Sequence, residues 1–119
     1  SSQVVWDAAL EVMGALPLEV IDREHYVIET GWMEGWSERP FGPLGGGVMG
    51  GQWKRRMKLL ARVTPTEANT ALMRIVSRVE EKAPAGSEAF RWQRVGSDGT
   101  MEHDIFRRVQ EQLTPAKTT

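Results

Sequence analysis

The glycine-rich tract at residues 40–51 is the feature that most constrains the fold. It reads Pro-Phe-Gly-Pro-Leu-Gly-Gly-Gly-Val-Met-Gly-Gly and lies between two segments with strand character. So long a stretch of weakly restricted backbone does not make a two-residue hairpin turn, and the strands must be joined by a long tip. Loops of this length are usually functional or disordered. We therefore expect a β-hairpin with a flexible tip at residues 40–51.

The segment 53–63 carries the clearest periodic pattern. Alternate positions are mainly apolar, and the positions between them are mainly basic, with Lys54, Arg56, Lys58 and Arg62 in a row. This period of two predicts a half-buried antiparallel strand with a basic outer face. The core positions that it predicts are Met57, Leu59, Ala61 and Val63.

Two further segments read as strands and a third is ambiguous. From Thr70 to Val79 the alternation restarts, with Met73 and Ile75 on the apolar face. Residues 26–36 form a less regular strand, in which two glycines indicate a bulge or a close backbone approach. Residues 90–95 are consistent with a short fourth strand or with an irregular packing segment, and the sequence leaves both open.

Amphipathic helices are predicted at both ends. Residues 4–16 carry apolar side chains at three- and four-residue spacing, and Pro17 ends the run. Near the other end, capping residues at 97–100 precede an apolar stripe that stops at Leu113. The expected fold is α+β: one domain over 1–119, a two-layer sandwich of a three-stranded antiparallel sheet, or four-stranded if 90–95 pairs, with both helices on one face.

Composition limits the chemistry. The chain has 119 residues, a formal net charge of −1, two histidines and no cysteine. Without cysteine it can form no disulfide, zinc–thiolate site or thiol nucleophile. The two histidines lie far apart, and no nucleophile with a partnered base can be assembled from the residues present. We expect a non-enzymatic protein with no metal ion and no cofactor, and the sequence holds no apolar run of the roughly 18 residues that a membrane span requires.

The candidate contact surface lies around the glycine-rich tract. Aromatic side chains and neighbouring cations flank the tract, and the predicted partner-binding residues are Trp36, Phe41, Trp53, Lys54 and Arg56. Rigid aromatic anchors beside an adaptable loop are typical of protein interaction surfaces. The basic strand face with nearby aromatics is also consistent with single-stranded nucleic acid or another ligand, which we keep as the alternative. Nucleic acid is the less favoured partner because sixteen acidic residues balance the charge, with Glu29 and Glu80 expected opposite the basic strand.

Over residues 4–113 the order of these features resembles a known family. The features are a first helix ending in a Leu-Pro step, an acid-bearing strand leading to Glu29-Thr30-Gly31-Trp32, the basic strand at 54–63, a partner strand, and a tryptophan before a terminal helix. This arrangement is similar to small domains of bacterial envelope lipoproteins, among them the outer-membrane assembly lipoprotein BamC and related uncharacterised lipoproteins.

The resemblance implies a helix-grip-like fold and a role in protein–protein contact within the envelope. It further implies export to the periplasm or outer membrane, with a lipidated cysteine upstream of Ser1 that holds the domain near the membrane. The partner would be an envelope protein, and the function that of an accessory in outer-membrane assembly. The family has no catalytic residues to transfer to this chain.

Overall fold

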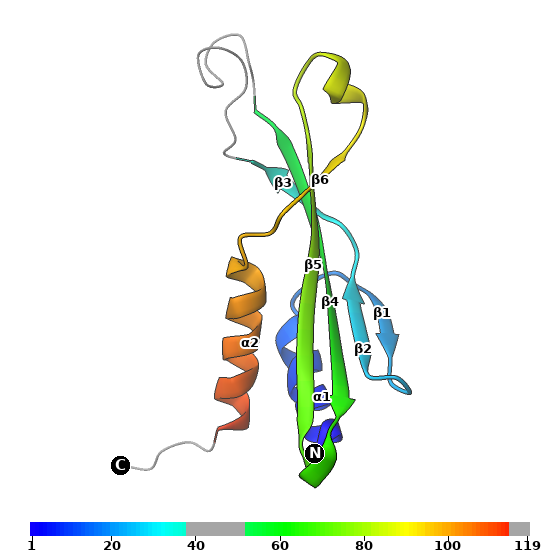
Figure 1. Ribbon diagram of the computed structural model, residues 1–119, viewed down its shortest axis with the longest axis vertical. Helices are drawn as coiled ribbons and strands as arrows, with labels where there is room; N and C mark the ends of the chain where they lie inside the picture. The colour runs from blue at the N-terminus through cyan, green and yellow to red at the C-terminus, as the bar shows by residue number, and fades with distance from the viewer. Residues whose placement is uncertain (38–51, 115–119) are drawn as a thin grey trace, which may run out of the picture. The chain divides into compact units, whose positions relative to one another are not determined.

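The computed structural model describes residues 1–37 and 52–114 (Figure 1). The predicted tip at 40–51 therefore lies outside the described residues. In chain order the elements are α1 (Ser2–Met13), β1 (Leu18–Asp22), β2 (Val27–Thr30), β3 (Met33–Trp36), β4 (Lys54–Pro65), a 3-10 turn (Glu67–Asn69), β5 (Ala71–Lys82), a second 3-10 turn (Ser87–Phe90), β6 (Gln93–Val95) and α2 (Thr100–Leu113).

The fold is α+β, as predicted, but its sheet is larger than the predicted three or four strands. Six strands form it in the order β1-β2-β4-β5-β6, with β3 also paired to β4. The predicted strand at 26–36 is two strands, β2 and β3, which pair with successive parts of β4. Strand β1 was not predicted, and the ambiguous segment at 90–95 contributes β6, which pairs with β5.

The chain divides into two compact units. Unit 1 comprises Ser1–Gly31, Leu59–Ser77 and Asp98–Thr119, and unit 2 comprises Trp32–Lys58 and Arg78–Ser97. The long strands β4 and β5 each contribute one end to either unit. Neither unit is a continuous stretch of sequence, and we describe each by itself.

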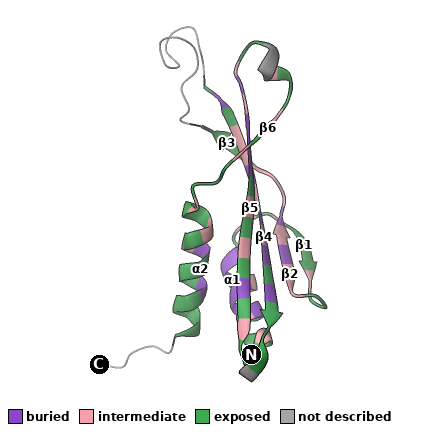
Figure 2. Cartoon of the chain, in the orientation of Figure 1, coloured by how far each residue is buried: buried purple, intermediate pink, exposed green. Residues whose placement is uncertain are grey.

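Unit 1 contains both helices and its own apolar core. Alternate positions on β2, β4 and β5 are buried with the apolar sides of α1 and α2, which contact each other. Figure 2 shows the buried positions on both helices and along β4. The core includes Trp6, Met13, Ile28, Leu59, Ala61, Val63, Met73, Ile105 and Val109.

The predicted register of β4 is confirmed. Met57, Leu59, Ala61 and Val63 are buried, whereas Arg62 is exposed. On β5, Met73 is buried and Ile75 is partly buried. One buried polar group also supports the strand, because the Thr30 hydroxyl accepts a hydrogen bond of 2.9 Å from the backbone N–H of Leu59.

Candidate functional site

One face of the unit 2 sheet gathers most of its cations and tryptophans. Opposite residues in an antiparallel pair share a face, so Glu34 lies with Arg56, Trp36 with Lys54, and Glu80 with Arg94. We call this surface the basic face. Its cations are Lys54, Arg56, Lys58, Arg78, Lys82 and Arg94, its aromatic residues are Trp32, Trp36 and Trp92, and its carboxylates are Glu34 and Glu80.

Cations and indole rings alternate across this face in a stack that we call the tryptophan ladder. The Arg56 guanidinium carbon lies 4.1 Å from the Trp32 ring centroid and 4.4 Å from that of Trp92. At the two ends, Lys58 Nζ is 4.9 Å from the Trp32 centroid and Lys82 Nζ is 5.9 Å from the Trp92 centroid. Cations over indole faces are attracted by the ring quadrupole, so the ladder fixes both rings relative to the strands.

Glu80 is the internal counter-ion of the ladder. Its buried carboxylate accepts a hydrogen bond of 2.8 Å from Arg56 Nε, and its second oxygen accepts one of 3.0 Å from Arg78 Nε. Burial acts to raise the pKa of Glu80, but the hydrogen bonds and positive charges of the two arginines outweigh it and hold the pKa below its usual value. Glu80 therefore stays ionised, and its single negative charge is shared between two cations of the basic face.

A groove of about 490 Å³ opens beside the ladder. Its lining residues are Glu34, Gly35, Trp36, Lys54, Lys82 and Trp92. The Trp36 side chain is 62% exposed, and Lys54 lies directly opposite it across the β3–β4 pair. The groove thus presents two indoles, two ammonium groups and one carboxylate to whatever enters it.

The structure places the predicted site residues in different environments. Trp36 and Lys54 line the groove, and Arg56 lies in the ladder with only 24% of its side chain exposed. Trp53 was placed on the contact surface by the sequence, but it is 4% exposed and so presents no surface to a partner. Its position one residue before β4 puts it in register with the buried face of that strand. Phe41 lies outside the described residues.

Sequence reasoning missed Trp92 and Lys82 as site residues. Both are brought to the basic face by the β5–β6 pair, which aligns Glu81 with Gln93 and therefore Lys82 next to Trp92. The signal was present in the ambiguous segment 90–95, since reading it as a strand antiparallel to β5 brings these two side chains together. Trp32 was noted only as an aromatic residue near the tract, and its stacking with Arg56 has no local sequence signature.

The titratable residues of the described ranges form no cluster that could hold a metal ion. Across residues 1–37 and 52–114, no three His, Asp or Glu side chains lie close enough to hold a metal ion together. His25 is exposed, and its Nδ1 lies 2.9 Å from Asp22 Oδ2, a contact that lowers the pKa of Asp22. In the same part of the chain, no helix has the length and apolar character needed to cross a membrane.

The two units differ strongly in charge. Unit 2 contains nine Lys or Arg and five Asp or Glu residues, a formal charge of +4. Unit 1 contains six Lys or Arg and eleven Asp or Glu residues, a formal charge of −5. The net charge of −1 for the whole chain is therefore the sum of a positive charge on unit 2 and a larger negative charge on unit 1. The net charge alone hides the basic character of unit 2.

Comparison with known proteins adds no assignment: no protein-family model matches the chain, and no curated protein and no solved structure matches it either.

Proposed function

We propose that this chain is a non-enzymatic binding domain whose contact surface is the basic face of unit 2, and that its partner is an acidic protein segment. The observation that carries the proposal is the exposed Trp36 indole in a groove with Lys54 and Lys82. An exposed aromatic anchor beside cations is the usual composition of an interaction hot spot. The positive charge of unit 2 favours an acidic partner and speeds its encounter.

The alternative ligand, single-stranded nucleic acid, is less well supported by the same contacts. Surfaces that bind single-stranded nucleic acid combine cations that contact the phosphates with aromatic rings on which the bases stack. Here Arg56 and Arg78 are both hydrogen-bonded to Glu80, and Arg56 lies over the rings of Trp32 and Trp92. Glu34, at the groove wall, can accept hydrogen bonds from the N–H groups of a peptide backbone, which a nucleic-acid backbone does not offer.

The resemblance to envelope lipoproteins supplies the cellular part of this proposal. On that basis the acidic segment belongs to an envelope protein, the domain acts as an outer-membrane assembly accessory with a helix-grip-like fold, and a lipidated cysteine precedes Ser1. The sequence encoded upstream of Ser1 tests this part. A signal sequence that ends in a lipidation motif supports the envelope location, and a cytoplasmic domain fused there contradicts it.

Defined ligands test the contact surface. Fluorescence anisotropy compares three labelled probes: an extended peptide of alternating Glu and Phe, the same peptide with Gln for Glu, and a single-stranded oligonucleotide of similar charge. We expect the acidic peptide to bind most tightly. Trp36→Ala and Lys54→Glu are each expected to raise the Kd for this peptide about tenfold or more, which corresponds to about 1.4 kcal/mol of binding free energy. The matched control is Phe90→Ala, because Phe90 is 86% exposed in unit 2 and does not line the groove.

The results distinguish the proposed acidic protein partner from nucleic acid, and the groove from other contact surfaces. Tighter binding of the oligonucleotide, lost in Trp36→Ala, replaces the protein partner with nucleic acid. Equal binding of the acidic and neutral peptides removes the role of charge. An equal loss in Phe90→Ala and Trp36→Ala removes the groove as the contact surface.

A further inference from the structure

Unit 1 leaves one face of its sheet open. The strand positions that alternate with the core positions point away from α1 and α2, and they remain partly or fully exposed. Five of them are apolar and come from all four strands of the unit: Val20, Val27, Leu60, Leu72 and Val76. Leu72 alone is 60% exposed. We call this surface the open face.

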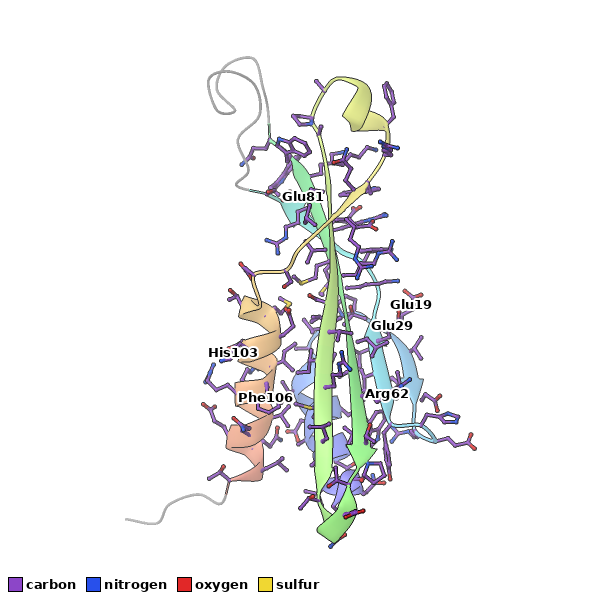
Figure 3. The ribbon with its side chains drawn as sticks, viewed as in Figure 1. Glu19, Glu29, Arg62, Glu81, His103 and Phe106 are labelled. Atoms are coloured by element: carbon purple, nitrogen blue, oxygen red, sulfur yellow. The ribbon has the colours of Figure 1, made fainter. Side chains whose placement is uncertain are left out.

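Charges on the open face are sorted by strand. Glu29 on β2 lies opposite Val20 and Leu60, which places it on this face. Glu19 joins it from the bulge in β1, because a Cβ at Gly31, two residues after Glu29, would lie 2.9 Å from Glu19 Oε2. Figure 3 shows Glu19 and Glu29 near each other on β1 and β2, with Arg62 on β4. The β1–β2 side is therefore acidic.

The other side of the open face is basic. Arg62 lies opposite Val27 and is exposed, and Arg74 is exposed between Leu72 and Val76 on β5. The face thus carries carboxylates on the β1–β2 side and arginines on the β4–β5 side, with aliphatic side chains on every strand. A surface with this layout is complementary to itself after a half-turn rotation.

We propose that the open face is a homodimer interface, occupied by the same face of a second copy of this chain. A two-fold axis along the strands places β1 of one copy over β5 of the other and β2 over β4. Glu29 of each copy then lies near Arg62 of the other, because Leu60, the residue opposite Glu29, is two residues from Arg62 on β4. The aliphatic side chains then pack between the two sheets at the usual spacing of about 10 Å. The proposal concerns unit 1 alone and does not depend on what the basic face binds.

The area of the open face sets the expected affinity of the dimer. Four strands about 4.8 Å apart and about five residues long at ~3.3 Å each cover on the order of 300 Å² of flat area. That is well below the roughly 800 Å² per partner of a standard interface, so the dimer is weak and reversible, with a Kd of roughly 10–100 μM.

Sedimentation velocity from about 1 to 500 μM, a range chosen to bracket that Kd, tests the dimer. The wild type is expected to shift from monomer to dimer within this range. Leu72→Glu is expected to raise the Kd at least tenfold, whereas Val4→Glu leaves it unchanged, since Val4 is a similarly exposed aliphatic residue, at 53%, on α1. Circular dichroism confirms that each variant is folded.

A charge exchange tests the two-fold arrangement. Arg62→Glu and Glu29→Arg each set like charges against each other across the interface and raise the Kd. The double variant restores opposite charges and is expected to bring the Kd back to within about threefold of wild type. A wild type that stays monomeric at the highest concentration, or a double variant as weak as the single ones, overturns the proposal.

Discussion

The Arg56 guanidinium carbon lies 4.1 Å from the ring centroid of Trp32, and the same carbon lies 4.4 Å from the ring centroid of Trp92. The arginine thereby contacts two large rings at once. A planar cation suits this position, because it can stack on aromatic rings while its Nε donates to Glu80. The side chain that the sequence suggested as a contact residue is mainly held within the surface, with 24% of it exposed.

Arg56→Lys tests this role. An ammonium group offers neither a second flat face nor a fork of donors, so we expect a loss of about 1–2 kcal/mol in the free energy of unfolding. Urea denaturation at neutral pH measures it. Arg62→Lys, on the same strand but exposed, is the matched control and should change stability by less than about 0.5 kcal/mol. Equal losses in the two variants would contradict stacking as the cause.

Glu80 predicts an acid dependence. Its pKa is lower in the folded chain than its usual value of 4.5, so the stability that it supplies is fully present above pH 4.5 and is lost as the pH falls through the folded-state pKa. Glu80→Gln should cost on the order of 2 kcal/mol at pH 7, since removing one partner leaves the arginines poorly compensated. Urea denaturation of both proteins at pH 7 and pH 3 should show the difference shrinking in acid. A difference that is constant or grows in acid rules out this linkage.

The hydrogen bond from Leu59 to the Thr30 hydroxyl is expected to contribute to the stability of the fold. Thr30→Val keeps the shape but leaves the buried N–H of Leu59 without its acceptor, at a cost of about 1–3 kcal/mol. Thr30→Ser keeps the acceptor and should cost less, even though it removes a methyl group. Amide hydrogen exchange at Leu59 is the direct measurement, and undiminished protection in Thr30→Val would show that the bond is unimportant.

Leu59 itself tests the core of unit 1. Its side chain is fully buried, so Leu59→Ala should destabilise the chain by about 2–4 kcal/mol through loss of contacts and the cavity left behind. Leu72→Ala removes the same atoms from an exposed position and should cost less than about 1 kcal/mol. Chemical denaturation at low protein concentration compares them without interference from self-association.

The sequence predicted those parts of the fold that depend on local periodicity. Strand β4 and the strand positions of β5 follow from alternation, and both helices follow from their apolar stripes. Strand β1 escaped prediction because it is short, mostly exposed and interrupted by a bulge between Leu18 and Val20, which breaks the period of two. Trp6, the largest buried side chain of α1, lies just outside the stripe that spacing alone identified.

The site was less predictable because its members are far apart in the chain. Trp32, Arg56 and Trp92 meet only when β3, β4 and β6 take their places in the sheet. The prediction that Glu80 pairs with the basic strand is confirmed by its hydrogen bond from Arg56, since cross-strand charge pairing follows from the alternation of β4 and β5. Glu29, the other carboxylate expected there, lies opposite Leu60. Trp53 shows the opposite limit: its nearness in sequence to the glycine-rich tract says nothing about its burial.

Strands β4 and β5 are each 12 residues long, about twice the usual length, and each belongs to both units. This arrangement restricts how the gene can change. Because side chains alternate between faces, an insertion or deletion of one residue in either strand turns every following position to the wrong face of the sheet. Changes of two residues preserve the pattern. Two segments, between Thr30 and Leu59 and between Ser77 and Asp98, are expected to differ in length among proteins descended from this one. We expect these insertions and deletions to fall in the connecting loops, or to change the strands by two residues at a time.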